Sequence, residues 1–103
     1  MNARAKGRRG QQEAQNLLRD RDYSVAELNA GSAVEDFLAV DNFGVTWSCE
    51  VKNTQAITTA HRKQAMEQAK KRRLPWLLLS KIAGTSSWLV QRQGMQPVIW
   101  GEK

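Results

Sequence analysis

Apolar and polar residues alternate along residues 45–52, and this is the clearest pattern in the chain. The odd positions, beginning at Val45, are apolar, whereas the even positions, ending at Lys52, are polar. A period of two is typical of a β-strand with one buried face. Glu50 and Lys52 therefore point to the same side of the predicted strand, roughly 7 Å apart at a rise of about 3.3 Å per residue.

An apolar stripe at helical spacing precedes this strand. Ala14, Leu17 and Leu18 share one face of a helix, which predicts a helix over residues 8–21. Residues 1–7 lie ahead of it and are expected to form a flexible basic arm.

Two further strands are predicted between this helix and strand 45–52. Residues 23–28 alternate weakly, and residues 36–40 form a short apolar run that suits a central place in a sheet. The sequence Asp-Asn-Phe-Gly at 41–44 predicts a hairpin turn into strand 45–52.

The second half of the chain begins with another predicted helix. Thr58 or Thr59 is a suitable N-cap, and the helix is expected to run to about residue 73, just before Pro75. Three more strands are then expected, at 76–80, 87–91 and 97–100. A helix between strands 45–52 and 76–80 favours a right-handed parallel crossover.

Bulk properties limit the architecture and the class of protein. A chain of 103 residues forms one domain, residues 1–103, and contains no apolar run long enough to span a membrane. Its N-terminus has no apolar segment typical of a secretory signal. Cys49 is the sole cysteine, which excludes an internal disulfide, and it is expected to be a small buried hydrophobe. These features fit a reducing cytoplasm, which would be that of the host cell if a phage encodes the protein.

The positive charge is concentrated in two segments. The formal net charge is +6, and basic residues cluster in residues 4–9 and 62–73, whereas eight of the ten acidic residues lie between 13 and 50. Basic flanks around an acidic middle suit a polyanion that is held at its edges and cut at its centre. A solvated basic helix with a basic tail is the alternative interpretation.

Two carboxylates and one amine are the main candidates for chemistry. Asp36 opens a predicted strand, and Glu50 and Lys52 share one face of the strand that follows. A divalent ion would relieve the repulsion between the carboxylates and act as a Lewis acid for phosphodiester cleavage. Glu13, which lies on the apolar side of the first helix, is a further candidate for holding or orienting the ion.

Each candidate also has a structural interpretation. Asp36 suits a turn, Lys52 suits an ion pair with Glu50, and Glu13 suits the edge of its apolar stripe. Gln64 is expected on the surface of the second helix, with binding of water or phosphate as the alternative. His61 is expected at the surface, and the four tryptophans are expected to pack in the core or at a dimer interface.

In chain order, the candidate residues resemble the motifs of the PD-(D/E)XK nuclease superfamily. The pattern consists of Glu13, Gly31-Ser32, Asp36 and Glu50-Val51-Lys52. Together with Lys6-Gly7 and Tyr23, it is similar in particular to the small archaeal-type Holliday junction resolvases, and phage VRR-NUC nucleases are similarly close. The resemblance covers residues 6–80, and Glu35 stands where the family motif has proline.

This resemblance implies an α/β fold with a restriction-endonuclease-like αβββαβ core, in which helices flank a mixed sheet. It implies Mg²⁺ or Mn²⁺ held by Asp36, Glu50 and the Val51 carbonyl, with Glu13 assisting. Lys52 corresponds to the catalytic lysine, and Ser32 is expected near the cleaved phosphate.

The expected function is therefore a metal-dependent DNA endonuclease, most similar to a resolvase of branched DNA, that acts as a homodimer and leaves a 5′-phosphate. Its expected DNA-binding residues are Lys6, Arg8, Arg9, Ser32, Arg62, Lys63, Gln64, Lys70 and Lys71. A nuclease-like fold that binds DNA without cutting it and a flap or duplex nuclease are the alternatives.

Overall fold

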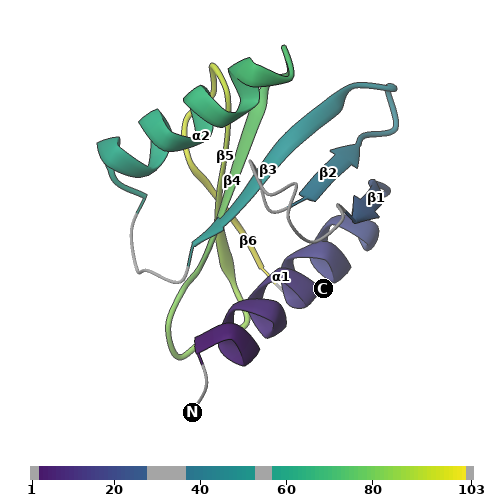
Figure 1. Ribbon diagram of the computed structural model, residues 1–103. Helices are drawn as coiled ribbons and strands as arrows, with labels where there is room; N and C mark the ends of the chain where they lie inside the picture. The colour runs from purple at the N-terminus through teal and green to yellow at the C-terminus, as the bar shows by residue number, and fades with distance from the viewer. Residues whose placement is uncertain (1–2, 28–36, 53–56, 102–103) are drawn as a thin grey trace.

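The computed structural model describes residues 3–27, 37–52 and 57–101, with side chains from residue 9 onward. Within these ranges, a six-stranded sheet in the order β1-β2-β3-β4-β5-β6 carries one helix on each face. Figure 1 shows α1 along one side of the sheet and α2 along the other. The predicted α/β architecture with a mixed central sheet flanked by helices is confirmed.

Helix α1 (Ala3–Arg19) begins five residues earlier than the predicted helix, so it includes most of the segment expected to be an arm. Its predicted stripe is largely correct, because Ala14 and Leu18 are fully buried against the sheet. The chain turns immediately after the helix, where Asp22 adopts a left-handed conformation with φ 68°. The Tyr23 amide then donates to the Leu18 carbonyl at 3.0 Å, which leads the chain into β1.

Strands β1 (Ser24–Glu27), β2 (Phe37–Val40) and β3 (Thr46–Lys52) form an antiparallel meander. The three strands were predicted, and their pairing order comes from the structure. The β2–β3 register pairs Val40 with Thr46 and Phe37 with Cys49. The predicted hairpin turn joins these two strands.

The predicted crossover is also present. Strand β3 pairs in parallel with β4 (Trp76–Lys81), and α2 (Thr59–Lys71) connects the two strands along the opposite face from α1. Thr58 caps α2 by accepting from the His61 amide, while the Thr58 amide donates to His61 Nδ1 at 3.3 Å. His61 therefore contributes to helix capping, a structural role that its sequence position alone does not indicate.

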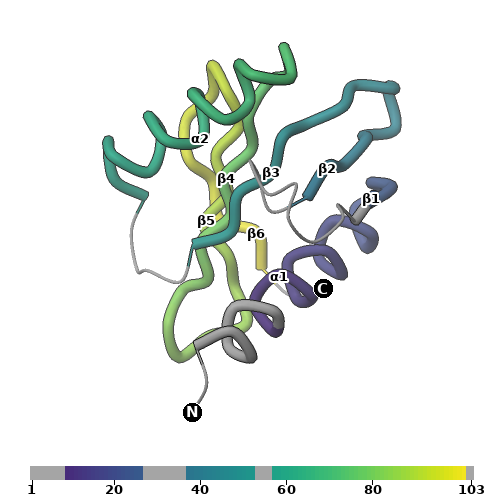
Figure 2. The backbone as a smooth tube through the Cα atoms, in the orientation of Figure 1, coloured from purple at the N-terminus to yellow at the C-terminus, as the bar shows by residue number. Residues whose placement is uncertain are grey.

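Strands β5 (Trp88–Arg92) and β6 (Val98–Trp100) complete the sheet as antiparallel neighbours of β4 and of each other. Figure 2 shows this course, with β6 at the opposite edge of the sheet from β1.

Each face of the sheet has its own core cluster. Under α1, ten buried residues pack together, including Leu18, Phe37, Cys49, Leu79 and Trp100. Under α2 the buried cluster has only four members, which are Ala65, Ala69, Trp76 and Leu78. Buried Cys49 confirms its expected role as a small core hydrophobe.

Candidate active site at the end of β3

The alternation along β3 determines where its polar side chains lie. Cys49 belongs to the cluster under α1, so Glu50 and Lys52 face the α2 side. Glu50 is only 5% exposed, and Lys52 Nζ lies 4.0 Å from its Oε2 atom. A carboxylate taken out of water is costly unless other groups compensate its charge, and Lys52 supplies one opposite charge.

Helix α2 adds a third polar group. Lys52 Nζ donates to Gln64 Oε1 at 2.7 Å. This bond joins the end of β3 to the first turns of α2 and limits the positions available to the lysine amine. Gln64 is exposed on the surface of α2, as expected, and its side-chain oxygen is in addition the acceptor for Lys52.

The sheet pairing changes at the point where these residues lie. The described β2–β3 ladder reaches Cys49, opposite Phe37, whereas the β3–β4 ladder continues to Lys52, opposite Ser80. The last three residues of β3 therefore extend beyond the described part of β2 while remaining paired with β4. Asp36, which directly precedes Phe37, and Ser32 lie outside the described residues.

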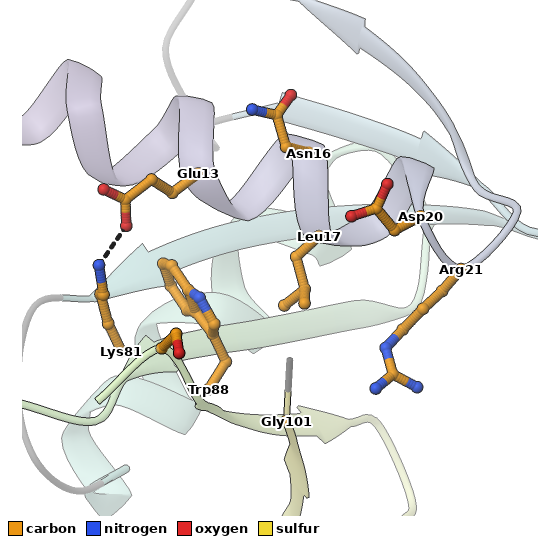
Figure 3. A pocket seen from close by; sticks show the side chains of 9 residues that line it. Glu13, Asn16, Leu17, Asp20, Arg21, Lys81, Trp88 and Gly101 are labelled. Carbon is orange, nitrogen blue, oxygen red and sulfur yellow. Dashed lines mark hydrogen bonds and ion pairs between the residues drawn. The ribbon is translucent and has the colours of Figure 1, made fainter. Parts of the chain in front are cut away.

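Glu13 lies elsewhere. Its carboxylate forms an ion pair with Lys81 at the end of β4, beside a pocket of about 310 Å³ between α1 and strands β4 and β5. Figure 3 shows the pair at one end of this pocket, with Trp88 and Leu17 on its apolar side. Lys81 follows Leu77 and Leu79 at a spacing of two, so this pair belongs to the α1 face.

The donor types at the end of β3 suit a hard cation. Glu50 supplies a carboxylate, and the neighbouring Val51 supplies a backbone carbonyl, and both are oxygen ligands of the type that Mg²⁺ prefers. Among residues 3–27, 37–52 and 57–101, no three Asp, Glu, His or Cys side chains gather closely enough to hold a metal ion. The donors described here fit part of a magnesium shell.

The seven basic residues expected to bind DNA fall into three groups. Arg9, Lys63, Lys70 and Lys71 are exposed, as contact with phosphate requires. Arg62 instead donates to the Ile57 carbonyl and to Thr59 Oγ1 at the start of α2, so it also supports the helix terminus. Lys6 and Arg8 lie in α1, in the part for which no side chains are described.

The tryptophans serve the core, as predicted. Trp76, Trp88 and Trp100 are buried. Trp100 packs against Tyr23, with ring centroids 6.2 Å apart, and the Arg21 guanidinium lies 4.4 Å from its ring centroid. Burial raises the pKa of Tyr23 more than the nearby Arg92 lowers it.

A mixed sheet with this order of helices and strands is the architecture of a nuclease-like fold. The structure of Hjc, a Holliday junction resolvase from the archaeal hyperthermophile Archaeoglobus fulgidus, superposes with a TM-score of 0.61. The match covers 91% of this chain and 85% of Hjc at 11% sequence identity, so it establishes a shared fold. No family profile and no curated protein matches the sequence. None of the helices described is long and apolar enough to cross a membrane.

Proposed function

We propose that the protein is a metal-dependent endonuclease that hydrolyses DNA phosphodiesters, with branched DNA such as a four-way junction as its substrate. The observation that carries the proposal is the buried Glu50 carboxylate beside Lys52 at the end of β3. The fold shared with a Holliday junction resolvase supports it.

In this proposal Glu50, the Val51 carbonyl and Asp36 hold Mg²⁺ or Mn²⁺. Phe37 pairs with Cys49, the residue before Glu50. Asp36 is assigned to this shell from the sequence, in which it directly precedes Phe37. Such an ion, when bound by these residues, would supply Lewis acidity for phosphodiester hydrolysis. Glu13 is left out of the metal shell, because Lys81 pairs with its carboxylate on the α1 face.

Lys52 is proposed to act on the nucleophile and on the developing negative charge. The Gln64 bond restrains its amine, which then needs little reorganisation to contact the attacking water or a phosphate oxygen. A positioned cation of this kind stabilises a transition state more than it stabilises the ground state.

The remaining basic residues are proposed to hold the DNA backbone without reading the bases. Arg9 on α1 and Lys63, Lys70 and Lys71 on α2 are exposed for this role, and Lys6, Arg8 and Ser32 are assigned to it from the sequence. A homodimer would present two such sites in symmetric positions, as paired cuts in a four-way junction require.

Cleavage of a synthetic four-way junction in Mg²⁺ or Mn²⁺ tests the proposal. The wild-type protein should nick the junction, and Glu50→Gln should reduce the rate by at least about 100- to 1,000-fold while retaining affinity for DNA. Lys52→Gln should also reduce the rate severely, because it removes the charge at nearly constant size.

Flap and linear duplex substrates, run in parallel, identify the preferred geometry. Binding without nicks in either metal would overturn the assignment in favour of a DNA-binding module. Equal loss of binding and cutting in Glu50→Gln would contradict the role given to Glu50.

A further inference from the structure

The hairpin between β2 and β3 presents an aromatic side chain on a hydrogen-bonded turn. Phe43 is 87% exposed, although the backbone around it is held by a single carboxylate. Asp41 Oδ1 accepts from the amides of Phe43 and Val45 at 2.9 Å, and Oδ2 accepts from Trp47 Nε1 at 3.0 Å. Gly44, with φ 86°, allows the chain to close the turn.

The charge state of Asp41 keeps this turn in place. Burial acts to raise the pKa of Asp41, but the hydrogen bonds from Trp47, Val45 and Phe43 outweigh it and lower the pKa below the ordinary value. The Asp41 carboxylate is therefore ionised at neutral pH. The turn that it stabilises keeps the Phe43 side chain exposed to solvent.

The C-terminus of α2 lies at the same end of the sheet. The chain that leaves α2 passes beside β3, where the Ser48 amide donates to the Pro75 carbonyl at 2.8 Å. In Figure 1 the end of α2 and the β2–β3 hairpin both lie in the upper part of the view. Four consecutive exposed basic residues, 70–73, occupy this end of α2.

Arg73 is present where glycine is the usual residue. The Arg73 amide donates to the Lys70 carbonyl and the Leu74 amide to the Ala69 carbonyl, which is the Schellman arrangement that ends many helices. In this arrangement Arg73 takes φ 57°, a left-handed conformation that glycine adopts without steric cost. A charged side chain at a position with an unfavourable backbone conformation is a candidate for a functional role of the charge.

We propose that Phe43 and residues 70–73, here called the hairpin end, form a second nucleic-acid contact, in which the cations bind phosphates and Phe43 stacks on an unpaired or terminal base. This inference rests on the proposed function. It specifies a second contact that holds the DNA substrate at a distance from the cutting site. Base stacking on an aromatic ring beside a basic track is the usual way in which proteins hold a single strand.

The composition of this end favours nucleic acid over a lipid surface. A helix that lies on a membrane needs a broad exposed apolar face. In α2 the apolar residues Ala65 and Ala69 are buried against the sheet, and Met66 is the exposed large apolar residue of this helix. A single protruding ring and four consecutive cations at the same end of the sheet suit a strand of bases and phosphates better.

The hairpin end and the cutting site are at opposite ends of β3. From Thr46 to Lys52 the strand spans about 20 Å at about 3.3 Å per residue. A nucleic-acid strand that contacts both sites therefore covers about six nucleotides at about 3.4 Å each.

Equilibrium binding of a labelled four-way junction and of a single-stranded oligonucleotide, in chelator and over a range of salt concentrations, tests the inference. Arg73→Gly should weaken binding and reduce the slope of log K against log salt by about one. The same variant should melt at the same or a higher temperature, because glycine suits the left-handed position. Arg73→Lys, which retains the charge, is the matched control and should bind like the wild type.

The proposed stacking role of the Phe43 ring is tested with variants that keep an apolar side chain. Phe43→Leu keeps an apolar side chain without a ring and should bind the single strand about 5- to 100-fold more weakly. Phe43→Trp should bind at least as tightly as the wild type. Ile99→Thr changes a residue that is 65% exposed on the edge strand β6 and should leave binding unchanged.

The outcomes separate this inference from the proposed function. If Arg73→Gly and Phe43→Leu bind DNA like the wild type while Glu50→Gln still abolishes nicking, the hairpin end is not a DNA contact and the nuclease assignment stands. If the wild type binds neither DNA form, both assignments are wrong. Binding to vesicles of phosphatidylserine and phosphatidylcholine with the same dependence on Phe43, and no effect of Phe43 on DNA, would assign the hairpin end to lipid.

Discussion

The two faces of the sheet differ in what they bury. The face under α1 is mainly apolar, with a cluster of ten buried residues that includes Leu77 and Leu79, although Gln15 of α1 is also buried. The face under α2 has an apolar cluster of four and also buries polar side chains, namely Ser48, Glu50 and Ser80. The same strands β3 and β4 supply both faces, because successive side chains alternate between them.

This difference suggests that the α1 face contributes most to stability and that the α2 face contains the groups suited to chemistry. Burial of apolar area is the main favourable term in folding, and the α1 face contains most of it. A buried carboxylate adds little or nothing to stability, yet it is the kind of group that binds a cation. We therefore expect substitutions on the α1 face to change stability and substitutions around Glu50 to change activity.

The largest expected effect on stability is in the α1 cluster. Leu79→Ala should lower the free energy of unfolding by about 3 kcal/mol, because it leaves a cavity among fully enclosed neighbours. Leu78→Ala, one position along on the α2 face, is the matched control and should cost about 2 kcal/mol, since its cluster is smaller. Urea unfolding measures both, and a larger loss for Leu78→Ala would reverse the comparison.

A smaller effect of opposite sign is expected at Glu50. Glu50→Gln removes a buried charge at constant size and should leave the protein as stable as the wild type or more stable by about 1 kcal/mol, although it abolishes cutting. Thermal melting without metal measures this. Destabilisation by more than about 2 kcal/mol would show that Glu50 serves the fold.

The smallest effect is expected for the ion pair between Glu13 and Lys81. Both side chains are partly exposed, at 38% and 35%, so a double-mutant cycle with Glu13→Gln and Lys81→Met should give a coupling energy of about 0.5 kcal/mol. The cutting rate of Glu13→Gln should fall far less than that of Glu50→Gln. An equal fall would place Glu13 in the catalytic site despite its pairing with Lys81.

Periodicity predicted the elements of the fold because it reflects local geometry. The alternation in residues 45–52 identified β3 and the face that carries Glu50, and the stripe containing Ala14 and Leu18 identified α1. The parallel pairing of β3 with β4 was predicted because a helix lies between these two strands in the sequence. The start of α1 was missed by five residues, because residues 3–7 are too polar to show a stripe.

The pairing of Lys52 with Glu50 was expected from their shared strand face, whereas contacts between different elements were beyond sequence reasoning. Lys81 pairs with Glu13 from 68 residues away, and neither residue carries a local signal of the other. The predicted strand ended at residue 80, one residue before Lys81. The structure extends the strand to Lys81, which puts this residue on the same face as Leu79. The Gln64 bond to Lys52 depends likewise on how α2 packs across the sheet.

The strand order has a consequence for how the chain folds. Within the described sheet, five strand pairings join neighbours in the chain, and of these β3 with β4 is the parallel pairing whose strands are separated by a helix. The antiparallel pairings close short loops, whereas the parallel seam requires α2 to form and dock first. We expect two meanders, β1–β3 and β4–β6, to assemble early, and their joining along β3 and β4 to be the slow step that creates the surroundings of Glu50.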